Sequence, residues 1–157
     1  MAASTAPRYD LQNTQGPYIQ VPVDANTTIY YGTLVATSTA TSGVGANGLL
    51  TPCADTASFR FYGQAAQTVV NTGTSGGEVS CPVYPSSTLQ WLTVNATSPT
   101  ELWVNQMIYA VDDHTGCLAG SSTNKVALGR CLQVTNTTTA GSIVINCADR
   151  YAVDAVA

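Results

Sequence analysis

The residues of this chain that could do chemistry lie closest together around its one histidine. His114 follows two aspartates, Asp112 and Asp113, and precedes Thr115. An aspartate that orients a histidine beside a nucleophile is the arrangement of a catalytic triad, which also needs a nearby oxyanion site. Consecutive residues of an extended strand point to opposite faces, so Asp112 and Asp113 are not expected to share a substrate. The small and polar residues of this segment instead predict a hairpin turn.

The remaining polar side chains form no catalytic, cofactor or metal motif. The nine acidic residues are scattered and give no paired carboxylates of the kind that hydrolyse glycosides. A calcium loop, with alternating acidic ligands and a closing glutamate, is also missing. Gly73, Gly76 and Gly77 fit a flexible hairpin and precede no helix that could cradle a phosphate. We therefore expect a protein that is not an enzyme and binds no cofactor or metal.

The composition favours a part of an assembly. The 157 residues suit one domain, and only 9% are charged, compared with about 25% in a typical soluble domain. On a surface with so little charge, electrostatic repulsion between molecules is weak, so association is easily tolerated. One lysine and four arginines are spread along a chain of net charge −4, so no basic stripe is expected to bind nucleic acid.

Five cysteines, an odd number without any C-x-x-C pair, are expected to be free thiols that act as small apolar side chains. That state suits assembly in a reducing cytoplasm. The N-terminus has no apolar segment of the kind that a secretory signal needs, and no apolar run is long enough to span a bilayer. A membrane partner is therefore not expected.

The order of residues along the chain predicts an all-β protein. Residues 1–17 are polar and small, and we expect an extended N-terminal arm there, followed by a single β domain over 18–157. Short runs rich in β-branched and aromatic residues alternate with turn signals, which is typical of a compact β-barrel or a sandwich. The expected strands are residues 18–23, 33–37, 59–68, 78–84, 89–94, 107–111, 125–134 and 142–146.

At most one short helix is expected, opening at residues 98–101. Ser98, Pro99 and Glu101 match a capping box with proline in the first helical position. The Leu-Trp-Val that follows, residues 102–104, is expected to cover one end of the barrel. Trp103, Trp91 and the eight tyrosines could form a carbohydrate platform, but core or subunit interface is the commoner role of such aromatics.

Several segments resemble a family of small phage head proteins. Residues 32–36 (GTLVA), 61–66 (FYGQAA) and 78–83 (EVSCPV) follow the family's order, and residues 129–131 (GRC) match its closing pattern. The most specific match is residues 108–115 (IYAVDDHT), close to the recurrent Y-x-V-D-D-x-T. The family is that of the capsid decoration or cement proteins related in fold to the lambda head decoration protein. Just before this strand, where the family usually has glycine, the chain has Asn105, which tolerates the same left-handed backbone.

The resemblance implies a β-tulip-like domain and a mechanical function. Such proteins sit on the outer surface of the virion capsid, commonly as homotrimers, and tie neighbouring major capsid subunits together as the head expands. The chain would be made in the host cytoplasm, with the major capsid protein as partner. Apolar burial and strand addition would supply the binding energy. The alternatives are a virion fibre head or carbohydrate-binding module that uses an exposed Trp91 or Trp103, and a small hydrolase that needs His114.

In that interpretation the arm binds the capsid and the turn belongs to the scaffold. The capsid-binding residues are expected in the arm and at the start of the first strand, and the family-like turn carries no catalytic meaning. An arm that orders only on binding would suit recognition of the mature shell. The arm residues are Arg8, Tyr9, Leu11, Tyr18 and Ile19, and the turn residues are Asp112, Asp113, His114 and Thr115.

Overall fold

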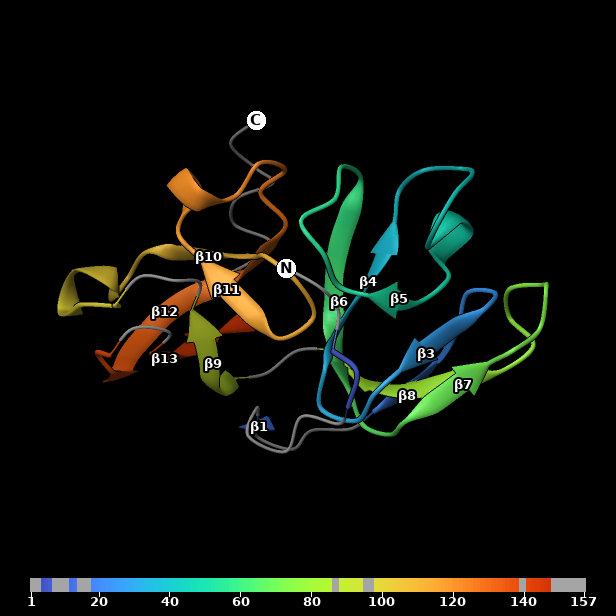
Figure 1. Cartoon of the computed structure of the whole chain (residues 1–157), viewed down its shortest axis with the longest axis horizontal. Helices are drawn as coiled ribbons and strands as arrows, with labels where there is room; N and C mark the ends of the chain where they lie inside the picture. Colours follow the sequence, from blue (N-terminus) through green and yellow to red (C-terminus); the bar gives the residue numbers. More distant parts are fainter. Residues whose placement is uncertain are drawn as a thin grey trace.

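The fold is all-β, as expected from the sequence. Its strands form three layers. In the computed structural model the described residues are 4–6, 12–13, 18–85, 88–94, 98–138 and 141–147. A small barrel packs on one face of a five-stranded sheet, and a two-stranded ribbon covers the other face (Figure 1). Helical structure in these residues is limited to three single 3₁₀ turns, and none of it is long and apolar enough to cross a bilayer.

The barrel is a closed ring of five strands from the second half of the chain. In ring order β9, β11, β10, β12 and β13 each pair with the next, and β13 pairs back with β9. Only the β9–β11 pair is parallel. Closure removes the free sheet edges that would otherwise invite aggregation. The strands are β9 (Thr88–Val94), β10 (Met107–Ala110), β11 (Thr115–Cys117), β12 (Ala127–Asn136) and β13 (Ser142–Asn146).

The first half of the chain forms the open sheet and the ribbon. Strand order in the sheet is β2-β8-β6-β4-β5, so β2 and β5 are its edges. The ribbon is β3 paired with β7, and the short β1 pairs with β9 of the barrel. The elements are β1 (Gln12–Asn13), β2 (Ile19–Pro22), β3 (Thr27–Ile29), β4 (Leu34–Ser38), β5 (Thr51–Pro52), β6 (Phe59–Ala65), β7 (Val69–Asn71) and β8 (Ser80–Tyr84).

Two apolar cores hold the layers together, and strand β4 contributes to both. Leu34 and Ala36 join Phe61 and the barrel residues in the larger core, whereas Val35 points into the core under the ribbon. This alternation follows from the two-residue period of a strand. The open sheet is buried on both faces, which explains the apolar run in β4.

The expected strands are found near their predicted places, with shifted ends. The strand expected over 59–68 ends at Ala65, and the one expected over 125–134 starts at Ala127 because Lys125 has a left-handed backbone with φ 54°. Strands β1, β3, β5, β7 and β11 were not expected, and β1 falls within the predicted arm. Each has only two or three residues, too few for a periodic pattern, and forms through its partner.

The short helical turn is present, but its predicted cap is wrong. Element η2 (Glu101–Trp103) begins after Thr100 and has no side-chain cap, so Ser98 does not act as the N-cap. The prediction that residues 102–104 cover one end of the barrel is also only partly right. Trp103 is buried, whereas Leu102 is 84% exposed and Val104 is exposed as well, because a three-residue turn can bury only one face.

Asn105 takes the left-handed backbone expected where the family usually has glycine. Its φ is 71°. Its amide donates to the carbonyl of Cys131, and its own carbonyl accepts from Nη1 of Arg130 at 2.6 Å. These bonds fix the approach of the chain to β10.

Candidate functional site

The densest group of polar side chains is the turn between β10 and β11. Asp112 and Asp113 are 2% and 1% exposed, and His114 is partly buried. Nδ1 of His114 lies 2.7 Å from Oδ1 of Asp113 and 3.3 Å from Oδ1 of Asp112. An ionised carboxylate can only accept, so Nδ1 carries the proton in the shorter pair. We call these three residues the DDH cluster.

The local sequence bends the backbone so that both carboxylates face one imidazole. The amide of Val111 donates to the carbonyl of Thr115 and closes the hairpin, and the amide of His114 donates to Oδ1 of Asp112 at 3.0 Å. Aspartates form such turns readily. The expectation that Asp112 and Asp113 point apart is therefore wrong, because they sit in a bend and not in an extended strand. Thr115 is buried as the first residue of β11.

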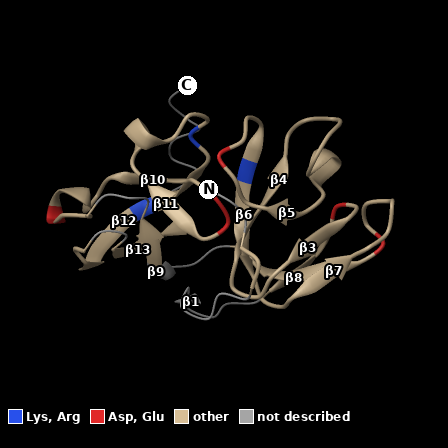
Figure 2. Ribbon diagram, viewed as in Figure 1, with Lys and Arg blue, Asp and Glu red and all other residues tan. Residues whose placement is uncertain are grey.

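Asp113 joins the barrel, the open sheet and the N-terminal segment. The amide of Ser4 donates to its two oxygens at 2.8 and 3.0 Å. Its own backbone carbonyl accepts from the amide of Leu34 at the start of β4. The acidic turn thus lies between the barrel and the open sheet, where Figure 2 shows it in red. No sequence pattern pointed to Ser4, because a backbone amide leaves no signal in residue type.

Asp112 has one oxygen that the fold leaves unsatisfied. Its Oδ2 is buried and has no hydrogen-bond partner among the described residues. A buried polar atom without a partner typically costs about 1–3 kcal/mol, and more when it belongs to a charged group. Such an atom in a native fold calls for a water, an ion or a proton that satisfies it.

The Asp113–His114 pair has the geometry that orients a catalytic imidazole, but the neighbouring thiol is not a nucleophile. Burial raises the pKa of Cys53 far above its usual range, and the negative charges of Asp113, Asp112 and Asp55 raise it further. Only a thiolate attacks efficiently. The environment therefore holds Cys53 as a neutral thiol, and the cluster does not activate it.

All five cysteines are free and buried, as expected from their number and spacing. Burial raises the pKa of Cys81 to about 12 and that of Cys117 to about 11, and it also raises the pKa of Cys131. The thiols act as small apolar side chains: Cys53, Cys131 and Cys147 lie in the larger core and Cys81 in the core under the ribbon.

The fold is expected to lose stability as the pH rises above about 9. Thiols of the unfolded chain ionise there, while Cys81 and Cys117 stay protonated in the fold up to about 12 and about 11. The stability is complete below the unfolded pKa and falls by about 1.4 kcal/mol per pH unit for each such thiol. Urea unfolding across this pH range would measure the decline. The decline should be shallower in Cys81→Ala. An equally steep decline in that variant would show that the buried thiol of Cys81 does not cause it.

The expected capsid-binding residues fall in two groups. Arg8, Tyr9 and Leu11 lie outside the described residues. Tyr18 is 57% exposed and Ile19 is exposed beside it at the start of β2. Tyr84 at the end of β8 supports Tyr18 through an edge-to-face ring contact with centroids 6.5 Å apart. Strand β2 is an edge of the open sheet and pairs with β8. On its outer side Leu50 bridges the end of the strand, because the amide of Leu50 donates to the carbonyl of Pro22 at 2.8 Å.

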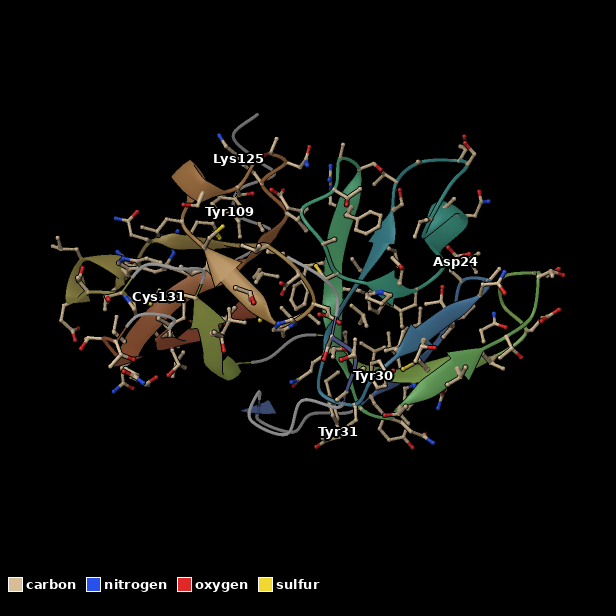
Figure 3. The ribbon with its side chains drawn as sticks, in the orientation of Figure 1. Asp24, Tyr30, Tyr31, Tyr109, Lys125 and Cys131 are labelled. Atoms are coloured by element: carbon tan, nitrogen blue, oxygen red, sulfur yellow. The ribbon has the colours of Figure 1, made fainter. Side chains whose placement is uncertain are left out.

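The tryptophans give little support to a carbohydrate platform. Trp103 is 8% exposed and belongs to the larger core, so the expectation that it could stack on a sugar is wrong. The side chain of Trp91, in β9, lies outside the described residues. Exposed aromatic surface comes instead from tyrosines such as Tyr18 and Tyr31. Figure 3 shows Tyr31 at the outer rim of the open sheet and ribbon.

Charged side chains are sparse, and apart from the pair Asp112 and Asp113 they do not gather by sign. Arg60 lies on β6, Lys125 in the loop before β12 and Arg130 within β12. Figure 2 shows the blue segments apart from one another. Asp55 fixes that loop, because its carboxylate accepts from the amides of Thr123 and Asn124 at 2.7 and 2.8 Å. In the described part of the chain, several charged side chains make hydrogen bonds within the fold, and they form no charged binding face.

Comparisons with protein-family models, curated proteins and solved structures found no match to this chain.

Proposed function

We propose that this chain is a non-enzymatic decoration protein that binds the outer surface of a phage head. Its partner is the major capsid protein, and it stabilises the expanded shell by bridging neighbouring capsid subunits. A homotrimer on the virion surface, assembled from protein made in the host cytoplasm, fits the family that residues 108–115 resemble.

The observation that carries the proposal is the exposed start of strand β2. Tyr18 and Ile19 expose an aromatic and an aliphatic side chain there. The outer edge of β2 is closed at its far end, where the carbonyl of Pro22 accepts from the amide of Leu50, whereas the edge beside Ile19 pairs with no other described strand. Edge strands of this kind can add a strand from a partner, and exposed tyrosines commonly anchor interfaces. The edge directly follows the N-terminal segment in which the other contact residues are expected.

The interior arrangement supports a scaffold role for the family-like segments. Residues 108–115 form most of the β10–β11 hairpin, and Asp113 is used to hold Ser4 and the imidazole of His114. Cys53, the neighbouring thiol, is held in its neutral form by burial and by nearby carboxylates. The surface carries few charges, which weakens repulsion against neighbouring subunits.

Placing a charge at the start of β2 should strongly weaken capsid binding. We expect Tyr18→Asp and Ile19→Asp each to lower the affinity for expanded heads by about thirtyfold or more, as central interface residues do. The measurement is the fraction of protein that sediments with undecorated heads. Leu102→Asp is the matched control, because Leu102 is a more exposed apolar residue on the barrel.

Binding that survives both substitutions on β2 would contradict the assigned contact surface. Specific binding of the isolated protein to a glycan array, together with no binding to heads, would favour the fibre-head or carbohydrate-binding alternative, with the exposed tyrosines as its platform.

A further inference from the structure

We propose that the DDH cluster is a binding site for a divalent transition-metal ion, with Asp112, Asp113 and His114 as the protein ligands. The proposal is independent of capsid binding and runs against the expectation from sequence that no metal is bound. It rests on the burial of two carboxylates, on the unsatisfied Oδ2 of Asp112 and on the distances among the three side chains.

Among the described residues, the charge of the two carboxylates in the cluster is not balanced. Two carboxylates that are 2% and 1% exposed lie next to each other, and His114 is the one described basic residue within ion-pair distance of them. Buried carboxylates are normally paired with a cation or coordinate a metal. One imidazole cannot neutralise two carboxylates, whereas a divalent ion can.

The unsatisfied oxygen points to a missing ligand at the same place. Oδ2 of Asp112 is the buried side-chain oxygen without a hydrogen-bond partner in the described part of the chain. The other oxygen of the same carboxylate, Oδ1, is 3.3 Å from Nδ1 of His114. A bound ion would satisfy this oxygen, directly or through a coordinated water.

The distances suit first-row metals. One ligand atom from each of the three residues can be chosen so that all lie within 4.8 Å of one another. With metal–ligand bonds of about 2.1 Å, neighbouring ligand atoms stand roughly 3.0–3.4 Å apart. The contact between Asp112 and His114 already has this length, and the 2.7 Å contact between Asp113 and His114 must widen by a few tenths of an ångström. The ion would replace the proton on Nδ1, which leaves to solvent.

The surroundings supply the supporting bonds and the access that a metal site needs. The Ser4 amide donates to both oxygens of Asp113 and so holds that carboxylate in place. The side chain of His114 is 19% exposed, which leaves a route from solvent. Two oxygens and one imidazole nitrogen favour Zn²⁺ or Co²⁺ over Ca²⁺ and Mg²⁺, which prefer oxygen ligands alone.

The test is a titration of the full, metal-stripped protein with Zn²⁺ and Co²⁺, followed by calorimetry and by NMR of the imidazole. His114 is the one histidine of the chain, so every imidazole signal belongs to it. We expect one ion per chain, a shift of the imidazole resonances at that stoichiometry, and a Co²⁺ spectrum without the intense thiolate band that cysteine ligands would give.

Variants separate this site from adventitious binding. His114→Ala and Asp112→Asn should each weaken binding at least tenfold, whereas Glu101→Gln, which removes an exposed carboxylate elsewhere, should leave it unchanged. Imidazole resonances that do not move, a thiolate band, or equally tight binding by His114→Ala would overturn the proposal. The NMR titration uses the unmodified chain, so the proposal stays testable if a variant fails to fold.

Discussion

Gly129→Ala is expected to lower the free energy of unfolding by roughly 3–5 kcal/mol. Gly129 has φ 152° at the irregularity where β12 pairs with Ile108 of β10. Side chains rarely adopt that backbone conformation, which costs about 1–3 kcal/mol. A Cβ there would also overlap the carbonyl of Asn146 in β13, whose carbon would be 2.7 Å away. Overpacking against backbone adds about 1–3 kcal/mol.

Gly120→Ala is the matched control for this substitution. Gly120 lies in the turn η3 (Ala119–Ser121), and an added Cβ meets nothing within 4 Å. The free energy of unfolding of Gly120→Ala should stay within about 0.5 kcal/mol of the value for the unmodified chain. Urea unfolding followed by tryptophan fluorescence measures both variants. Equal stability of Gly129→Ala and Gly120→Ala would show that the pairing of β12 with β10 and β13 does not need glycine at residue 129.

Asp113→Ala is expected to lower the free energy of unfolding by roughly 2–4 kcal/mol and to release the N-terminal segment. The substitution removes the acceptor of the Ser4 amide and of Nδ1 of His114. Each partly buried donor left unpaired costs about 1–3 kcal/mol. Unfolding by urea gives the first effect, and hydrogen exchange at the Ser4 amide gives the second, since that amide should exchange faster in the variant.

Glu101→Ala is the control for Asp113→Ala. Its carboxylate is exposed at the start of η2 and should contribute less than about 0.5 kcal/mol. Unchanged exchange at the Ser4 amide in Asp113→Ala would mean that Asp113 does not anchor the N-terminal segment.

The fold class and the main strands could be predicted from sequence because they depend on local patterns. Alternation of apolar residues and clusters of turn residues are visible along the chain, and they gave β13 with its observed ends and β8 with a start two residues too early. Closure of the barrel could not be predicted in the same way. It depends on the pairing of β9 with β13 and of β9 with β11, strands that are far apart in sequence.

The candidate site was predicted in position but not in geometry. The segment around Asp112 was recognised as a turn, yet its two carboxylates were expected to point apart. The bend places both beside His114, and the distant Ser4 completes the set of bonds. The cover by residues 102–104 was predicted only in part, because the packing of η2 beside β12 buries Trp103 and leaves Leu102 exposed. Contacts of this kind come from tertiary packing, which residue types alone do not reveal.

The most direct test of capsid decoration is sedimentation of the purified protein with undecorated phage heads, expanded and unexpanded, followed by imaging of the pelleted particles. We predict saturable binding to expanded heads alone, with density on the outer surface where neighbouring capsid subunits meet. The β2 edge, with Tyr18 and Ile19, should face the shell. Absence of binding to either form of the head would contradict the proposed function.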